Sequence, residues 1–441
     1  MFGCNHFVCK QSTRNPPTMN PFRFDRLPTD DSFFDREVEV KRIAKAISDG
    51  ENLLVYGLRR MGKTSCLLRA ARLAAAEHDA VCFFADLSLY SSLADVTEAL
   101  LKSALPELGS LGDRAAQFIA GAVSGLVLKP HVKAKFDGSA SGGSELELEI
   151  GAELRGKDAA AHSKALTEVL DALDKLAKKR KRPVAIIFDE FTFVEAIGPD
   201  RVSWQLRGAM QRHQNIVYIM AGSVRHMIDR LHGEHGPFYG MFGRLVIERI
   251  DPDLMAKWID ESCERHGVKA TGVGAACIRW AGSRTRDIVQ LARRTFDIAL
   301  ETKVATEATV ADAIKALLED FDEEFWRLWS PLSSMNRSIL QAVALGYGAS
   351  LFHGEIIARF NLDSTGHVSQ ACRTLERNRE GSAGYRPPIL GRIERGNKVE
   401  IVFDNPFFQS WVAGVTQPRR IAAFTFRFGD RGGPSSKPTE S

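Results

Sequence analysis

The residues Gly57 to Thr64 have the spacing of a phosphate-binding loop, G-x-x-x-x-G-K-[ST]. Its two glycines let the backbone curve closely around an anion, and successive N–H groups then point at the phosphates. We expect Lys63 to reach the β- and γ-phosphates and the Thr64 hydroxyl to ligate Mg²⁺. The residues predicted to bind nucleotide are Gly57, Leu58, Arg59, Arg60, Met61, Gly62, Lys63, Thr64 and Ser65.

The sequence on either side of this loop predicts a strand before it and a helix after it. The run from Leu53 to Tyr56 is short and apolar, and the run from Ser65 to Ala74 is rich in good helix formers. A strand, a glycine loop and a helix, in that order, place the phosphates at the helix N-terminus. A glycine turn that binds no nucleotide is the alternative, and it leaves both flanks unexplained. The loop therefore predicts a site for a nucleoside triphosphate.

A second pair of candidate catalytic residues, Asp189 and Glu190, follows the apolar run from Val184 to Phe188. A buried strand would deliver both acids at its C-terminal end, where α/β sheets bind their ligands. Asp189 would hold Mg²⁺ through its water shell, and Glu190 would orient and deprotonate the attacking water. Strands often end in acids, so this pair gains its meaning from the phosphate-binding loop upstream. Together the two motifs predict hydrolysis of a nucleoside triphosphate.

Two further candidates for catalysis lie at the ends of other predicted strands. Ser223 follows the apolar run from Ile216 to Gly222, and it could contact the γ-phosphate or the attacking water. A plain Gly-Ser turn is the alternative for Ser223. Arg244 stands at the start of a strand predicted at 245–250, where it could stabilise transition-state charge in a neighbouring subunit.

Length and composition narrow the class of protein. The 441 residues suffice for two or three domains, and 44% hydrophobic with 26% charged residues is ordinary for a globular chain. We expect no membrane span, because no run of about 18 apolar residues occurs. The first residues lack the pattern of a secretory signal, and the seven scattered cysteines favour reduced thiols in the cytoplasm. The net charge of +4 permits nucleic-acid binding without requiring it.

We expect the nucleotide-binding α/β domain to span residues 31–251. Residues 1–30, which contain several prolines, and residues 413–441, which are rich in glycine and proline, are predicted to be a disordered arm and tail. Within the domain, residues at about 125–152 alternate apolar and polar side chains around a glycine-serine stretch. We expect an inserted β-hairpin there, with lysines on one strand paired to glutamates on the other.

The helical patterns of residues 252–330 predict a lid of three or four helices. Arg284 and Arg286 open its third helix, where a cation could reach a nucleotide. Arginines that only face solvent are an equally good explanation.

Residues 331–412 have the pattern of a winged helix-turn-helix domain. Three short helices precede two strands that alternate around Gly396-Asn397, and the helix predicted at 365–377 takes the recognition position. Nine Lys/Arg against seven Asp/Glu in residues 332–412 are few for a DNA footprint. Contact with duplex DNA and docking of a protein therefore both stay open. The candidates for DNA contact are Arg373, Arg377, Arg392, Arg395 and Lys398.

Several stretches resemble the archaeal-type ATPases of the AAA+/STAND group. The loop from Tyr56 to Ser65 is similar to that family's G-x-R-R-x-G-K-T-S sequence, and Phe34 to Glu37 resembles its F-x-x-R-E element. The stretch from Ile187 to Phe191 resembles its D-E-F sequence. Weaker similarity to the family at Gly222-Ser223 and between residues 236 and 244 extends the resemblance, which covers residues 33–412.

The resemblance implies an α/β P-loop NTPase of ASCE/AAA+-like type, with a parallel sheet ordered 5-1-4-3-2, a helical lid and a C-terminal winged helix. It implies an ATP-dependent, Mg²⁺-requiring ATPase that forms homo-oligomers or docks partners. Such a protein would act on duplex DNA, or alternatively serve as a signalling or defence switch whose winged helix binds protein. A small-molecule kinase is disfavoured, because Glu190 suits the activation of water.

Two positions depart from the family pattern. Thr192 stands where a Gln often follows D-E-F, and Gly282-Ser283-Arg284 stands where the STAND pattern has G-x-P. The second departure brings the lid closer to the AAA+ type, in which an arginine senses the nucleotide.

Overall fold

The structure, a computed structural model of the chain, describes residues 20–24, 33–107, 126–136, 144–154, 159–180, 182–199, 201–223, 225–376, 379–381, 384–386, 388–395 and 398–416. These residues form two compact units. The sheet unit consists of the described residues from 33 to 249, and the helical unit consists of those before 33 and after 249. In the described ranges, no helix has the length and apolar character needed to span a lipid bilayer.

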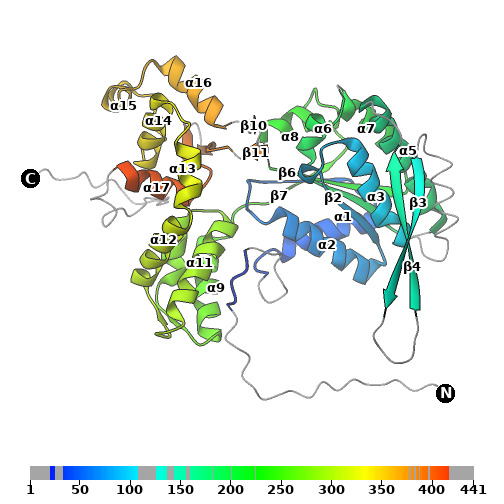
Figure 1. The fold of residues 1–441 in the computed structure, drawn as a ribbon, viewed down its shortest axis with the longest axis horizontal. Coiled ribbons are helices and arrows are strands. Elements are labelled where there is room, and N and C mark those ends of the chain that lie inside the picture. The colour runs from blue at the N-terminus through cyan, green and yellow to red at the C-terminus, as the bar shows by residue number, and fades with distance from the viewer. Residues whose placement is uncertain are drawn as a thin grey trace, which may run out of the picture. The chain divides into compact units, whose positions relative to one another are not determined.

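The sheet unit is built around five parallel strands in the order β2-β5-β6-β1-β7. Figure 1 shows this unit, with β2, β6 and β7 labelled. If these strands are numbered along the chain without the inserted hairpin, the order is 5-1-4-3-2. This order confirms the predicted α/β P-loop fold class. The five strands are β1 Leu53–Tyr56, β2 Val81–Asp86, β5 Val184–Asp189, β6 Ile216–Gly222 and β7 Gly243–Val246.

Helices cover both faces of this sheet, which is why its central strands are apolar throughout. Every residue of β5 and β6 is buried. Alternate residues of a strand face opposite sides, so Leu53 and Val55 of β1 join one hydrophobic cluster while Leu54 joins the other. The first cluster lies under α1 Glu37–Asp49 and α2 Lys63–His78. The second lies under α3 Leu93–Glu107, α5 Ala159–Arg180 and α7 Val202–Met210.

Short helical turns follow three of the strands and complete the sheet unit. They lie after β2, β5 and β6, at the carboxyl ends of these strands. Their bounds are Leu87–Leu89 for η2, Phe191–Phe193 for η4, Val194–Ile197 for α6 and Arg225–His232 for α8.

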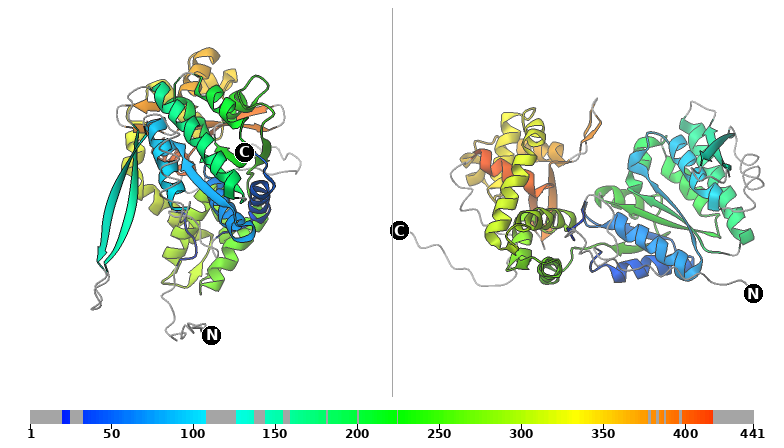
Figure 2. Two further views of the ribbon diagram at one scale, coloured as in Figure 1. Left: turned by 90° about the vertical axis from the view of Figure 1, so that its right-hand side faces the viewer. Right: turned by 60° about the horizontal axis from the view of Figure 1, so that its bottom comes forward.

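The inserted hairpin expected at about 125–152 is present as β3 Leu126–Phe136 and β4 Ser144–Leu154. These antiparallel strands form a sheet of their own, separate from the five-stranded one (Figure 2). The register places the backbone positions of Lys133 and Lys135 opposite those of Glu147 and Glu145. The expected alignment of lysine with glutamate positions is therefore confirmed at the level of the backbone.

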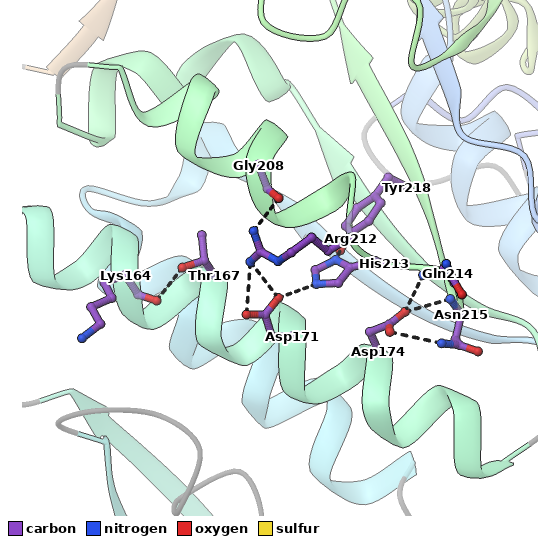
Figure 3. A network of polar contacts seen from close by, with 10 residues as sticks. All are labelled: Lys164, Thr167, Asp171, Asp174, Gly208, Arg212, His213, Gln214, Asn215 and Tyr218. Atoms are coloured by element: carbon purple, nitrogen blue, oxygen red, sulfur yellow. Dashed lines mark hydrogen bonds and ion pairs between the residues drawn. The ribbon is translucent and has the colours of Figure 1, made fainter.

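A polar network fastens α5 to the amino end of β6 (Figure 3). His213 contacts the Tyr218 hydroxyl through Nδ1 at 2.6 Å and the Asp171 carboxylate of α5 through Nε2 at 2.7 Å. The Asp174 carboxylate, one turn further along α5, accepts the backbone N–H of Asn215 at 2.8 Å and its side-chain amide at 3.1 Å. Tyr218 is fully buried, so its hydroxyl needs such a partner.

Residues 252–330 of the helical unit form five helices, where three or four were predicted. Helix α9 begins at Pro252, and Asp251 caps it by accepting the N–H groups of Asp253 and Leu254 at 2.9 and 3.1 Å. A short parallel pair, β8 Lys269–Ala270 and β9 Val304–Ala305, joins its loops. The helices are α9 Pro252–Arg265, α10 Val273–Ala281, α11 Thr285–Ala299, α12 Glu307–Asp320 and α13 Asp322–Trp329.

The C-terminal elements follow in the same compact unit, so the boundary expected at 330/331 does not divide it. The Trp411 indole N–H donates to the Asp322 carboxylate at 2.7 Å, which links the last helix to α13. The elements are α14 Ser334–Ala344, α15 Gly354–Arg359, α16 Thr365–Glu376, β10 Arg379–Gly381, β11 Gly384–Arg386, β12 Leu390–Arg395, β13 Lys398–Phe403 and α17 Pro406–Thr416.

The prediction of a disordered arm is wrong for residues 20–24. The other residues of the predicted arm lie outside the described chain. Phe22 is fully buried, with its ring centroid 5.5 Å from that of Trp258 and 6.1 Å from that of Phe296. The Asn20 amide donates to the Asp297 carboxylate at 2.7 Å. A single aromatic ring in a distant pocket leaves no periodic signal in the sequence.

Two boundaries also differ from those expected. Helix α17 begins at Pro406, where Asn405 caps it and the proline occupies the first turn, and it continues to Thr416, past the predicted start of the tail at 413. Strand β7 begins and ends earlier than the predicted 245–250. It is an edge strand of four residues, and half of them are exposed. The apolar run in the sequence therefore did not mark the bounds of this strand.

Candidate functional site

Three neighbouring strands deliver polar groups to the same edge of the sheet. The loop that begins at Gly57 follows β1, the acids Asp189 and Glu190 lie at the end of β5, and Ser223 follows β6. These strands are adjacent in the order β5-β6-β1 and run parallel. The structure therefore brings together residues that the sequence separates by more than 100 positions.

The two glycines of the loop are required for different reasons. Gly62 has a φ of +94°, a left-handed conformation that residues with a Cβ adopt at a cost. A Cβ at Gly57 would instead collide with the carbonyl oxygen of Ile247, in the segment after β7. Helix α2 then begins at Lys63, and among the described residues no side chain caps it and no acid lies in its first turn. Its positive end is thus available to an anion.

Lys63 is buried, with a relative exposure of 5%. Its Nζ donates to the carbonyl oxygens of Gly57 and Leu58, each at 3.2 Å. The loop therefore holds the ammonium group against its own backbone. A buried ammonium group can form strong, charge-assisted hydrogen bonds with an anionic ligand.

A direct hydrogen bond joins the loop to the acid at the end of β5. The Thr64 hydroxyl Oγ1 donates to Asp189 Oδ2 at 2.6 Å. Burial raises the pKa of Asp189 from 3.8 to about 6, and the hydrogen bond from Thr64 opposes that rise. The nearby carboxylates of Glu190 and Asp86 raise the pKa further. A hydroxyl and a carboxylate oxygen are the hard ligands that Mg²⁺ prefers, so this pair fits that ion.

Glu190 lies beside this pair in a strained conformation. Its φ of 46° and ψ of 44° are left-handed, which is uncommon for a residue with a side chain. Its N–H donates to Asp189 Oδ1 at 2.9 Å, and the Ser223 hydroxyl donates to Glu190 Oε2 at 2.8 Å. The site thus combines a strained acid, a buried lysine and a loop of backbone donors.

Comparison with known proteins bears on this arrangement. Residues 33–239 match the model of a family described as an ATPase domain predominantly from Archaea. These residues form an ATPase domain of that archaeal type. The predicted resemblance is confirmed for this domain, and the chain is a nucleotide-dependent ATPase.

Solved structures agree with this ATPase fold. The chain is similar to a Walker-type ATPase of Pyrococcus abyssi, with 15% identity, a TM-score of 0.55 and coverage of 89% of this chain and 99% of that chain. It is also similar to the ORC2 protein of Aeropyrum pernix in its ADPNP–ADP complexes, with 11% identity, a TM-score of 0.53 and coverage of 91% and 98%. No curated protein matches the chain in sequence.

The arginines proposed to act on the nucleotide of the ATPase domain have other contacts. Arg244 is exposed on β7, and its guanidinium donates to the carbonyl oxygen of His232 at 3.0 Å. Arg284, in the helical unit, pairs with the Asp404 carboxylate at 2.8 Å, and both side chains are nearly buried. This ion pair gives Arg284 a structural role between α11 and the start of α17. Arg286 lies in the first turn of α11.

The five candidates for DNA contact are only partly described. Arg373 is exposed on α16, and its guanidinium donates to the Ser369 hydroxyl at 3.2 Å. Arg392 of β12 pairs with Glu376 of α16 at 2.7 Å, which offsets its charge. Arg377 lies outside the described residues, and for Arg395 and Lys398 only the backbone is described.

Two features of the ATPase domain were missed at the level of sequence. Asp86, at the end of β2, pairs in register with Asp189 and adds a third carboxylate to the edge. The sequence signal for Asp86 was that an acid ends the apolar run of β2, as Asp189 ends that of β5. The hydrogen bond between Ser223 and Glu190 was missed because two strand ends 33 positions apart carry no local sign of contact.

Proposed function

We propose that the ATPase domain binds MgATP at the loop from Gly57 to Ser65 and hydrolyses it with Glu190 as the general base. The observation that carries the proposal is the hydrogen bond between Thr64 and Asp189. It joins the phosphate-binding loop to the strand-end acids, so both motifs serve one ligand. A phosphate-binding loop alone would support binding but not hydrolysis.

Each residue of the loop has a distinct task in this proposal. The loop N–H groups and the N-terminus of α2 bind the phosphates, and Lys63 exchanges its carbonyl partners for β- and γ-phosphate oxygens. Thr64 and Asp189 would hold Mg²⁺, and the ion would supply positive charge beside the phosphates. Arg59, Arg60 and the other loop side chains then frame the nucleotide.

Glu190 and Ser223 act on the attacking water in this proposal. The Ser223 hydroxyl holds one carboxylate oxygen of Glu190, which leaves the other to accept a proton from water. Ser223 therefore positions the base rather than contacting the γ-phosphate. The left-handed backbone of Glu190 supports this assignment, because strain of this kind is retained where function needs it.

The metal requirement provides the experiment. Thr64→Val keeps the shape of the side chain but removes the hydroxyl, so the Mg²⁺ concentration for half-maximal ATP hydrolysis should rise about tenfold or more. Thr97→Val is the matched control, because this buried threonine on α3 donates its hydroxyl to the Leu93 carbonyl oxygen of its own helix at 2.7 Å. A Mg²⁺ concentration for half-maximal hydrolysis by Thr64→Val equal to that of the parent would contradict the proposal.

The exposed Arg244 supports a second proposal about assembly. In a homo-oligomer its guanidinium would leave the His232 carbonyl and stabilise charge on the nucleotide of the neighbouring subunit. Mixing Arg244→Ala protein with Glu190→Gln protein should then restore part of the hydrolysis that each lacks alone. Absence of any restoration at concentrations where the chain self-associates would contradict this role.

We propose that α14, α15, α16 and the β12–β13 hairpin form a winged helix-turn-helix that brings the ATPase to duplex DNA, within a nucleoprotein assembly. The order of three short helices and a hairpin supports the fold, and the exposed Arg373 on α16 supports the contact. The ion pair between Arg392 and Glu376 favours the alternative, a signalling or defence switch that docks a protein.

A salt-dependent gel shift separates these two readings of the winged helix. DNA binding that weakens steeply between about 50 and 200 mM salt supports contact with phosphates. Arg373→Ala should then weaken binding, while Arg327→Ala, an exposed arginine on α13 paired with Glu323, should not. No shift at low salt contradicts the DNA proposal and favours a protein partner.

A further inference from the structure

Arg36, just before α1, is a buried arginine in the stretch from Phe34 to Glu37, outside both the phosphate-binding loop and the strand-end acids. Its relative exposure is 5%. One terminal nitrogen, Nη1, pairs with the Glu39 carboxylate at 2.7 Å. The other, Nη2, donates to the carbonyl oxygen of Met61 at 3.3 Å and to that of Glu248 at 2.6 Å. One side chain therefore joins three separate segments of the sheet unit.

The first of these contacts acts on the phosphate-binding loop. The Met61 carbonyl and the Gly62 N–H belong to one peptide, which is trans like the other peptides of the described chain. In a planar trans peptide the C=O and N–H point in opposite directions. By holding the Met61 carbonyl, Arg36 fixes the direction of the Gly62 N–H, a donor of the proposed phosphate cradle.

The second contact acts where the chain leaves the sheet unit. Glu248 lies between the end of β7 and the unit boundary after Arg249. Its neighbour Ile247 donates its N–H to the Tyr56 carbonyl at 2.7 Å and approaches Gly57 so closely that a Cβ there would collide with it. The exit segment is thus packed directly on the start of the loop.

Arg36 also lies close to the place where the chain enters the sheet unit, which begins at Phe33. Both connections to the helical unit therefore pass within a few residues of the atoms that Arg36 contacts. Burying a guanidinium costs desolvation energy, and its Nε has no hydrogen-bond partner among the described residues. An apolar side chain would avoid that cost, but it could not hold two carbonyls in fixed directions.

We propose that Arg36 is a positioning residue that couples the phosphate-binding loop to the two chain connections between the units. Arg36 holds the Gly62 N–H and the exit segment at Glu248 in one arrangement, and phosphate bound to that N–H favours the same arrangement, so nucleotide binding and order in the exit segment stabilise each other. The helical unit thereby responds to the state of the nucleotide site. This inference rests on the proposed function, because it needs a nucleotide on this loop.

The test compares four proteins, which are the parent, Arg36→Met, Arg36→Lys and Arg42→Met. Arg42 is the matched control, since it lies on α1 and pairs with Glu51, a residue outside the loop. The dissociation constant for Mg²⁺–ATPγS and the hydrogen exchange of residues 246–252 with and without this nucleotide are measured for each.

The parent and Arg42→Met should bind ATPγS equally, and nucleotide should slow exchange at 246–252 in both. Arg36→Met should bind about tenfold more weakly, with an equally raised KM and a kcat within about threefold, because ground-state and transition-state binding are lost together. At saturating nucleotide its 246–252 segment should stay unprotected. Parent affinity and parent protection in Arg36→Met would overturn the inference.

Arg36→Lys decides the case if Arg36→Met does not fold. Lysine keeps the charge for Glu39 but lacks the planar fork that reaches both carbonyls. Weaker ATPγS binding and lost protection support the inference, and parent values of both overturn it. If the parent itself binds no ATPγS, the proposed function fails instead, so the two failures are distinct.

Discussion

Strand β6 has a polar cluster at each end, and the two clusters differ in how well their members satisfy one another. At the amino end, His213 lies between Asp171 and Tyr218 with short hydrogen bonds on both ring nitrogens (Figure 3). Asp174 in turn accepts three hydrogen bonds from Gln214 and Asn215. A network of this kind contributes to stability, because nearly every buried polar group has a partner.

At the carboxyl end the polar groups are held in costly states. Burial raises the pKa of Asp189 to about 6, Glu190 has a left-handed backbone, and Lys63 bonds to uncharged carbonyls. Perturbed groups of this kind cluster at functional sites. The comparison supports our proposal that the carboxyl end binds and hydrolyses nucleotide, while the network at the amino end stabilises the domain.

Lys63→Ala should have the largest effect of these substitutions, and the effect should be confined to the polar cluster at the carboxyl end of β6. Without the ammonium group, ATP binding should weaken at least ~100-fold and hydrolysis should disappear, since charge-assisted contacts to phosphate are among the strongest. Unfolding in urea should be little changed or slightly more difficult, because a buried cation has been removed. Lys45→Ala, an exposed lysine on α1, is the control and should keep both properties.

Glu190→Gln should separate binding from chemistry. The amide can still accept from Ser223 but cannot take a proton from water, so hydrolysis should fall about 100-fold or more while the affinity for ATP changes little. Single-turnover hydrolysis and equilibrium binding measure the two effects. Parent-rate hydrolysis by this variant would show that Glu190 is not the base.

His232, the last residue of α8, is a further buried group at the carboxyl end of β6 with an incomplete set of hydrogen bonds. Burial lowers its pKa from 6.5 to about 4, helped by Arg244, and its Nε2 has no hydrogen-bond partner among the described residues. The unfolded chain binds this proton more readily than the folded one. Stability should therefore be complete above pH 6.5 and fall by about 3 kcal/mol as the pH drops toward 4.

His232→Phe tests this pH dependence, since a phenyl ring can keep the contacts with Phe238 and Phe242. Urea unfolding between pH 4 and pH 7 should then show a flatter pH profile than the parent. His235→Phe, an exposed neighbour, should leave the profile unchanged. An identical profile for His232→Phe would assign the acid sensitivity to other groups.

Asp171→Ala should disrupt the polar network at the amino end of β6 and leave the cluster at its carboxyl end intact. It leaves His213 Nε2 and the Arg212 guanidinium without their carboxylate, which should cost about 1–3 kcal/mol in the free energy of unfolding. Hydrolysis per folded molecule should stay at the parent level. Loss of activity without loss of stability would contradict the separation of the two ends. Asp49→Ala, which removes only an exposed ion pair, should cost less than about 1 kcal/mol.

Ser223→Ala should have the smallest effect. Glu190 would lose the hydrogen bond that orients it, and kcat should fall about three- to tenfold while KM stays the same. A raised KM with an unchanged kcat would instead indicate that Ser223 contacts the nucleotide directly.

The sequence predicted the parts of the site that lie in continuous motifs. Gly57 to Thr64 and Asp189-Glu190 each follow a short apolar run, so local pattern and strand direction were enough to place them at one edge. The family resemblance supplied the strand order. Long-range partners were not accessible in this way, because the pairing of Ser223 with Glu190 and of Arg284 with Asp404 depends on tertiary packing alone.

Two errors of the sequence prediction show which signals deserve more weight. Helix α17 was missed although Asn405-Pro406 is a good N-cap followed by a proline in the first turn. The docking of Phe22 was missed because prolines around it suggested disorder, and only the pocket formed with Trp258 and Phe296 reveals its role. Capping residues were visible in the sequence, whereas a single buried ring was not.

The most direct measurement is a crystal structure of Glu190→Gln with ATP and Mg²⁺. The account predicts that the γ-phosphate lies within hydrogen-bond distance of Lys63 Nζ, and that the metal lies on Thr64 Oγ1 with Asp189 in its water shell. Nucleotide bound elsewhere, or a metal that contacts neither Thr64 nor the shell of Asp189, would contradict the claim that both motifs serve one ligand.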